Sequence, residues 1–169
     1  LQRSSSLQSC NWRNCCWLIY KMRILVSGHR LHKLQNYDQE WIKMAIEEAV
    51  ESWSTHGMSF GLSGMASGVD LWFCDICKKM SIPYIACPPF EDQVDTMDSQ
   101  SVTHREICLQ DAVEIKKIRN SSMINLSEGG IIVWDGNKGA THNVLQQILE
   151  KQKDFVWINP VAEKVWKCF

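Results

Sequence analysis

Three glycine-containing segments hold the residues whose types and spacing could bind a phosphate group. SGHR (27–30), SGMASGVD (63–70) and WDGNKGATHN (134–143) each follow a short apolar run. Glycine lets the main chain approach an anion closely, and the free amides that open a helix attract negative charge. The last two segments lead into predicted helices, which is the setting that phosphate-binding turns need. We expect them to hold one common ligand, with ordinary surface turns as the alternative.

Five side-chain positions in or near these segments could add specificity. Arg30 could hold a phosphate with its forked donors, and Arg119 could close over the ligand from a helix, unless it is a solvated surface residue. Asp70 lies in a first helical turn, where it either offsets the helix dipole or accepts a hydrogen bond from a ribose hydroxyl. Asp135 could hold a sugar hydroxyl, and Thr141 could cap its helix or donate to a phosphate.

The predicted ligand site combines these positions, and the sequence assigns no catalytic residue and no metal ligand. No histidine has a convincing metal spacing, and Cys74 and Cys77 lack the second pair that a zinc site needs, so buried thiols are favoured. No serine lies in a nucleophile-elbow pattern. The candidate ligand-binding residues are Gly28, His29, Arg30, Ser63, Gly64, Met65, Ser67, Gly68, Asp70, Arg119, Asn120, Trp134, Asp135, Gly136, Gly139, Ala140 and Thr141.

Composition restricts the partners of this chain. Its 169 residues predict one domain, and 18 basic against 19 acidic residues give a net charge of −1. A chain with this net charge lacks the basic surface that nucleic-acid binding needs, so a nucleic-acid partner is disfavoured. No apolar run reaches the roughly 20 residues of a membrane span, so no membrane partner is expected. The scattered cysteines fit a reducing compartment and predict a cytoplasmic location.

The pattern of apolar residues divides the chain into three parts. Residues 1–21 have no sustained period, so we expect a leader that is unstructured or not native to the protein, with Met22 as the natural start. Residues 22–160 form the predicted domain. Residues 161–169 form a C-terminal tail that could add a short helix over a sheet edge.

Alternating strands and helices in the domain predict an α/β fold. The expected architecture is a three-layer, Rossmann-like parallel sheet of about five strands with helices on both faces, and its ligand lies at the carboxyl ends of the strands. The predicted strands are 23–27, 58–63, 83–88, 130–134 and 154–159; the predicted helices are 38–56, 69–80, 104–118, 119–126 and 141–153; residues 91–103 are a predicted loop.

The glycine segments, taken together, resemble a known family. GHRLHKLQNY (28–37), GMASGVD (64–70), RNSSM (119–123) and IIVWDGNKGATHNV (131–144), with a closing INP, resemble the YpsA-like branch of the SLOG superfamily, which also holds the Smf/DprA and LOG-type lysine-decarboxylase-like proteins. The resemblance runs from Met22 to Pro160. It implies a Rossmann-like fold, binding of a nucleotide or nucleotide-derived ligand, and a bacterial or phage origin.

Three departures from the family pattern shape the predicted function. No glutamate stands three residues after Thr141, so the catalytic carboxylate of the LOG hydrolases is missing, and Ala140 replaces a glycine of their phosphate turn. The stretch 111–120 is short, so the sheet is expected to lack a strand. We therefore predict a protein that binds or senses a nucleoside monophosphate or an ADP-ribose-like ligand without catalysis. The alternatives are an N-glycosidic hydrolase of LOG type and a DprA-like binder of single-stranded DNA. No cofactor is expected, and a homo-oligomer is possible.

Overall fold

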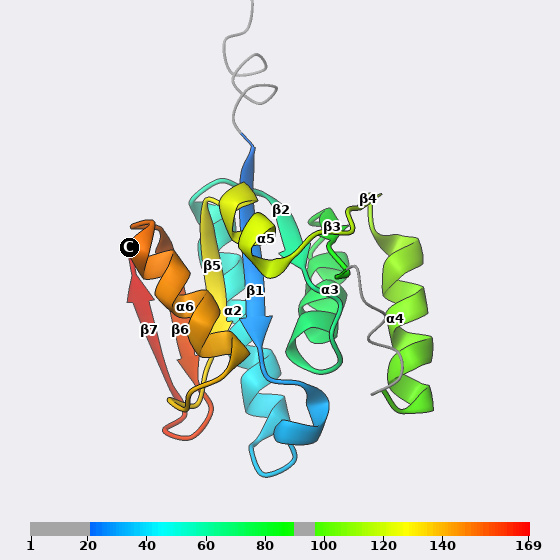
Figure 1. Ribbon diagram of the computed structural model, residues 1–169, viewed down its shortest axis with the longest axis horizontal. Helices are drawn as coiled ribbons and strands as arrows, with labels where there is room; N and C mark the ends of the chain where they lie inside the picture. The colour runs from blue at the N-terminus through cyan, green and yellow to red at the C-terminus, as the bar shows by residue number, and fades with distance from the viewer. Residues whose placement is uncertain (1–20, 90–96) are drawn as a thin grey trace, which may run out of the picture.

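The computed structural model describes residues 21–89 and 97–169, and within them seven strands form one sheet (Figure 1). The strands are β1 (Met22–Gly28), β2 (Met58–Ser63), β3 (Tyr84–Ala86), β4 (Glu114–Ile115), β5 (Gly129–Val133), β6 (Asp154–Asn159) and β7 (Lys164–Cys168). The helices are η1 (Leu31–Lys33), a 3₁₀ turn, and α2 (Gln39–Thr55), α3 (Val69–Lys79), α4 (Ser99–Asp111), α5 (Asn120–Leu126) and α6 (Ala140–Glu150). None of these helices is long and apolar enough to cross a membrane.

The sheet is covered by helices on both faces, so the predicted three-layer α/β fold is confirmed. Successive residues of a strand point to opposite faces, and β1 shows this directly. Ile24 and Val26 pack in the core beneath α2 and α3, whereas Leu25 packs in the core beneath α5 and α6. Helix α4 lies beside α3 at one side of the molecule (Figure 1). Each face therefore has its own apolar core.

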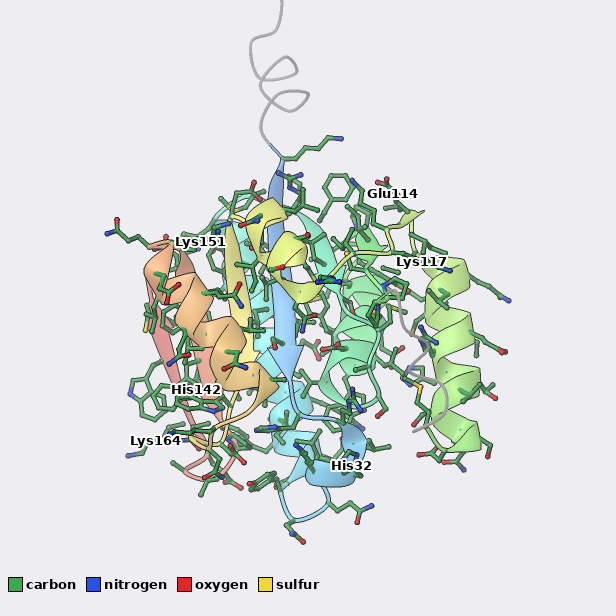
Figure 2. All side chains as sticks on the ribbon, in the orientation of Figure 1. His32, Glu114, Lys117, His142, Lys151 and Lys164 are labelled. Carbon is green, nitrogen blue, oxygen red and sulfur yellow. The ribbon has the colours of Figure 1, made fainter. Side chains whose placement is uncertain are left out.

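The strand order places a crevice at one end of the sheet. The order is β4-β3-β2-β1-β5-β6-β7, and every neighbouring pair is parallel except β6 and β7. The chain builds outward from β1 through β2, β3 and β4, and then returns to pair β5 with the other edge of β1. Such a reversal leaves an opening beyond the carboxyl ends of the two central strands. Figure 2 shows His32 at this end of the molecule and Lys151 at the opposite end.

The five predicted strands are all present, but the structure adds two more. The predicted short helix in residues 161–169 is wrong, because this segment forms β7, whose Trp166 stacks on Trp157 of β6 with ring centroids 4.4 Å apart. The strand that was expected to be missing is also present. It is β4, which pairs with β3 through only two residues.

Two predicted boundaries near α4 are also wrong. Asp98 accepts a hydrogen bond from the Ser101 amide, so α4 begins at Ser99, inside the predicted loop. It ends at Asp111 instead of continuing to residue 118, because β4 follows it. The predicted leader lies outside the described residues, apart from residue 21.

The approach of α3 to β1 depends on the absence of a side chain at Gly28. A Cβ atom there would lie 2.6 Å from the side chain of Val69, so we expect Gly28→Ala to destabilise the protein by about 1–3 kcal/mol. Gly139→Ala is the matched control, because no described atom lies within 4 Å of a Cβ at Gly139 and its φ of 162° suits any residue. Its effect should stay within about 0.5 kcal/mol. Urea unfolding measures both, and equal losses would contradict this view of Gly28.

Candidate functional site

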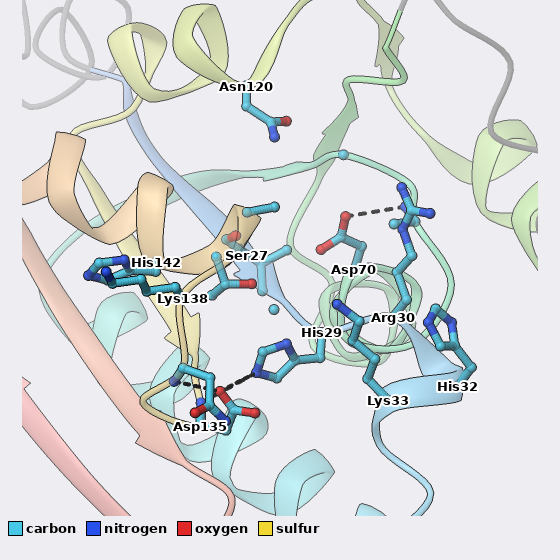
Figure 3. Close-up of a pocket in the computed structure, with 18 of the residues that line it drawn as sticks. Ser27, His29, Arg30, His32, Lys33, Asp70, Asn120, Asp135, Lys138 and His142 are labelled. Atoms are coloured by element: carbon cyan, nitrogen blue, oxygen red, sulfur yellow. Dashed lines mark hydrogen bonds and ion pairs between the residues drawn. The ribbon is translucent and has the colours of Figure 1, made fainter.

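A cavity of about 630 Å³ lies where β1, β2 and β5 end, at the reversal of strand order (Figure 3). Its walls come from the segments that follow these three strands and from the start of α5. The lining residues are Val26, Ser27, Gly28, His29, Arg30, His32, Lys33, Gly64, Ala66, Asp70, Asn120, Met123, Asp135, Asn137, Lys138, Gly139, Ala140, Thr141 and His142.

One wall of the cavity is cationic because of the turn that follows β1. Arg30 precedes η1 with an extended backbone, and its carbonyl accepts a hydrogen bond from the Lys33 amide at 2.9 Å. This turn is fixed from below by Leu34, whose side chain is fully buried. Three residues make one turn of a 3₁₀ helix, so Arg30 and Lys33 lie on the same side. Figure 3 shows both beside Asp70, with Lys138 across the cavity.

The start of α6 supplies main-chain donors to the opposite wall. Gly139 is the N-cap residue, and no side chain caps this helix. The first main-chain bond of the helix runs from the Asn143 amide to the Gly139 carbonyl, and no described residue accepts a hydrogen bond from the amides of residues 140–142. Because the free amides at a helix start carry partial positive charge, this wall can bind an anion.

The glycine turn before α3 differs, because the protein itself occupies several of its amides. The Met65 amide donates to Ser63 Oγ at 3.3 Å, and the Ala66 amide donates to Asp70 Oδ2 at 3.2 Å. The Val69 amide points to the His29 carbonyl at 3.5 Å. These three donors are engaged within the protein, whereas no described residue accepts a hydrogen bond from the amides of residues 140–142.

Asp70 is the buried acid of the cavity. Burial raises the pKa of its carboxyl group to about 7, although the Ala66 amide and the positive charge of Arg30 act in the opposite direction. Asp70 can therefore be protonated or ionised near neutral pH. In the protonated form it can donate a hydrogen bond to a ligand oxygen, and in the ionised form it can only accept one.

His29, Tyr37 and Asp135 form a hydrogen-bonded group, of which His29 and Asp135 line the cavity. The carboxylate of Asp135 accepts from the Tyr37 hydroxyl at 3.3 Å and from the Asn137 amide at 3.0 Å. The amide of Asp135 donates to His29 Nε2 at 3.3 Å, and the same nitrogen lies 3.3 Å from Asp135 Oδ1. Burial lowers the pKa of His29, and the opposing charge of Asp135 does not outweigh it. Burial acts to raise the pKa of Asp135, but the hydrogen bonds from Asn137 and the charge of His29 lower it overall.

The structure brings most of the sequence-derived candidates to this cavity. Ten of them line it, from all three glycine segments and from α5: Gly28, His29, Arg30, Gly64, Asp70, Asn120, Asp135, Gly139, Ala140 and Thr141. The sequence reasoning did not select several polar lining residues. These are Ser27, His32, Lys33, Asn137, Lys138 and His142. The position of Lys33, three residues after Arg30, is the signal that could have identified it.

Four candidates from the α3 turn lie behind the cavity wall and not in it. The Oγ of Ser63 is buried and donates to the Asp70 carbonyl at 3.0 Å, and Met65 is fully buried. Ser67 Oγ accepts from the Leu31 amide at 3.4 Å. Gly68 adopts a φ of 88° and packs directly against the main chain of residues 29–31. These residues shape the turn instead of lining the cavity.

Three further candidates also lie outside the lining. Arg119 is exposed at the start of α5. Gly136 supplies the turn with a φ of 93°. The ring of Trp134 stacks on His142 with centroids 5.2 Å apart, and its indole nitrogen donates to the Asn137 carbonyl at 2.7 Å. Trp134 therefore supports the loop that leads to α6.

Comparison with known proteins finds similar structures but does not assign the chain to a family. No protein-family model matches the sequence, and no curated protein sequence matches it significantly. Two solved structures of the molybdenum cofactor carrier protein MCP from Chlamydomonas reinhardtii are similar, with TM-scores of 0.55 and 0.53 and sequence identities of 17% and 16%. In both cases the match covers 82% of this chain and 76% of the carrier protein. This likeness supports the Rossmann-like fold.

The raised pKa of Asp70 predicts a pH-dependent stability. Because this pKa is higher in the folded protein than in the unfolded chain, folding takes up a proton between about pH 4 and 7, and the free energy of unfolding falls as pH rises through that window. Asp70→Asn keeps an acceptor for the Ala66 amide and carries no charge. Between pH 4 and pH 8, we expect the free energy of unfolding of Asp70→Asn to rise relative to that of the parent protein by up to roughly 4 kcal/mol.

Urea unfolding at several pH values measures this difference. Asp154→Asn, at the exposed start of β6, is the control and should show no comparable gain. Parallel stability profiles for the parent and Asp70→Asn would show that Asp70 does not carry this pH dependence.

Proposed function

We propose that this protein binds and holds a phosphate-bearing nucleotide derivative in the cavity at the ends of β1 and β5, without chemical change to the ligand. The observation that carries the proposal is the pairing of a cationic wall, Arg30 and Lys33, with the open amides of residues 140–142 across the same cavity. A phosphate group is the common ligand of forked cationic side chains and helix N-termini.

The size and place of the cavity support a small organic ligand. Its volume of about 630 Å³ lies within the usual range of small-molecule sites, and it occupies the position where open α/β sheets bind their ligands. The structurally similar proteins are named as carriers of the molybdenum cofactor. A carrier binds its ligand and releases it unchanged, so this likeness is consistent with a binding role, and the molybdenum cofactor is itself a ligand to test.

The polar groups of the cavity divide into two sets that suit the two ends of such a ligand. The phosphate end would lie between Arg30, Lys33 and the start of α6. Asp70 and Asn120 are left for hydroxyl or ring-nitrogen groups. Asp70 is nearly buried, so its hydrogen bond with a ligand would form away from bulk water and contribute to specificity. Asp135 contributes less, because Tyr37 and Asn137 already donate to its carboxylate.

Ligand binding tests the proposal directly. Isothermal titration calorimetry with AMP, ADP-ribose and the molybdenum cofactor should detect binding of at least one of them. Arg30→Ala and Lys33→Ala should each weaken that binding by about 10- to 100-fold, since each removes a charge-assisted contact. Lys151→Ala, at the opposite end of the molecule, removes one charge and should leave the affinity unchanged. Absence of heat from all three ligands with folded protein, or equal losses in all three variants, would refute the proposal.

Asp70 also supports a second candidate function, cleavage of the N-glycosidic bond of a nucleotide. A carboxylate with a pKa of about 7 in a ligand cavity can stabilise the positive charge that develops on the sugar ring. The position three residues after Thr141, which is glutamate in the LOG pattern, is Val144, and its side chain is buried in the core.

We expect no base release from nucleoside monophosphates above the rate in buffer, because Asp135, the other acid that lines the described cavity, already accepts hydrogen bonds from Tyr37 and Asn137. Chromatography of the reaction mixture measures the free base. Base release that disappears in Asp70→Asn but persists in Asp154→Asn would instead establish the hydrolase.

A further inference from the structure

A second cluster of reactive side chains lies between α3 and α4, at the side of the fold where α4 is attached (Figure 1). Asp75 comes from α3, and His104 and Cys108 come from α4. Residues four apart on a helix share one face, so α4 presents its imidazole and its thiol together toward α3. The sequence gives little indication of this cluster, because Asp75 lies 29 residues before His104.

The donor atoms of the cluster lie close together, at distances near those between the ligands of a metal ion. His104 Nε2 lies 2.8 Å and 2.9 Å from the two Asp75 oxygens, and Cys108 Sγ lies 3.8 Å from Asp75 Oδ1. One donor atom from each of the three residues lies within 4.8 Å of the other two. Tetrahedral zinc, with bonds of about 2.0–2.3 Å, requires its ligand atoms to be roughly 3.3–3.6 Å apart. A small movement of the imidazole away from the carboxylate therefore makes room for an ion.

The cluster is buried on the side of Cys108 and open to solvent on the side of His104 and Asp75. The Cys108 residue is only 3% exposed, whereas the side chains of His104 and Asp75 are 33% and 54% exposed. A surface cavity of about 440 Å³ is lined in part by Asp75 and His104. The thiol thus lies beneath the two exposed ligands, and a fourth coordination position would face solvent.

Contacts next to the cluster hold α4 against α3 and β3. Lys78 of α3 and Asp111 of α4 form an ion pair at 2.7 Å. The Tyr84 hydroxyl donates to the carbonyl of Cys108, so β3 fixes the backbone of the cysteine. Cys74, the neighbour of Asp75, is buried in the core, where its thiol contacts the Met65 sulfur and also interacts with the Cys108 thiol. The cluster consequently has three protein ligands in a prearranged position.

We propose that Asp75, His104 and Cys108 bind a divalent transition-metal ion of the zinc type, with water in the fourth position. An imidazole nitrogen, a thiolate and a carboxylate are the donors that Zn²⁺ takes in sites with three protein ligands. On binding, the metal takes the place of protons on His104 Nε2 and Cys108 Sγ, which pass to solvent. The ion would join α4 to α3. This site is separate from the proposed nucleotide cavity, with which it shares no lining residue.

Titration of the full-length protein with Co²⁺ and Zn²⁺ tests this site. We expect Co²⁺ to give a thiolate-to-cobalt charge-transfer band that Zn²⁺ abolishes, and Zn²⁺ to raise the melting temperature, since it binds only the folded site. Cys108→Ser should remove most of the band, and His104→Asn should weaken Zn²⁺ binding by about 100-fold or more. Difference spectra against these variants exclude signals from the cysteines at positions 10, 15 and 16.

Cys168→Ser is the matched control, because this exposed thiol lies on β7, away from the cluster, and the variant should bind both metals like the parent. His104 is a partly exposed surface residue, so His104→Asn is expected to fold even if Cys108→Ser does not. Circular dichroism checks this. A folded parent that binds neither metal, or a folded His104→Asn variant with parental Zn²⁺ affinity and cobalt band, would overturn the proposal.

Discussion

The candidate site depends on a direct main-chain contact between residues 29–31 and the start of α3. A Cβ atom at Gly68 would lie 2.7 Å from the Leu31 nitrogen and 2.8 Å from the His29 oxygen, so only glycine permits this approach. Two hydrogen bonds, from the Leu31 amide to Ser67 Oγ and from the Val69 amide to the His29 carbonyl, hold the segments together. Arg30 lies in the middle of this contact, and its position beside Asp70 follows from it.

The glycine turn before α3 differs from the glycine turn before α6. At α3 the protein's own hydroxyl, carboxylate and carbonyl groups accept from the amides of Met65, Ala66 and Val69, whereas no described residue accepts from the first amides of α6. Asp70 contributes to this difference by accepting from the Ala66 amide. Its position is unfavourable for its charged form, because burial of a carboxyl group raises its pKa. The cavity therefore contains one acid that can lose its charge, together with the side chains of Arg30, Lys33 and Lys138. That balance favours an anionic ligand over a cationic one.

The sequence predicted those parts of the fold and of the site that local residue patterns determine. Buried aliphatic runs that end in glycine, such as Ile24 to Val26 before Gly28, mark the central strands, and side chains just beyond these strands reach the cavity. The two added strands escaped prediction because all of their residues are exposed, and only pairing with β3 or β6 defines them. The hydrogen bond of the Val69 amide could not be predicted either, since it depends on residues 29–31 packing against a turn that is distant in sequence. Arg119 was selected for its residue type, but its place at the exposed start of α5 is set by how that helix packs.

The two outermost strands have a consequence for association between copies of the protein. An unpaired strand edge is a template for another strand, and short strands and lysines oppose such pairing. β4 offers only two residues, with Lys116 and Lys117 directly after it, and β7 carries Lys164 and Lys167. Sheet-to-sheet extension is thereby disfavoured at both borders, so any homo-oligomer would more readily use helical surfaces.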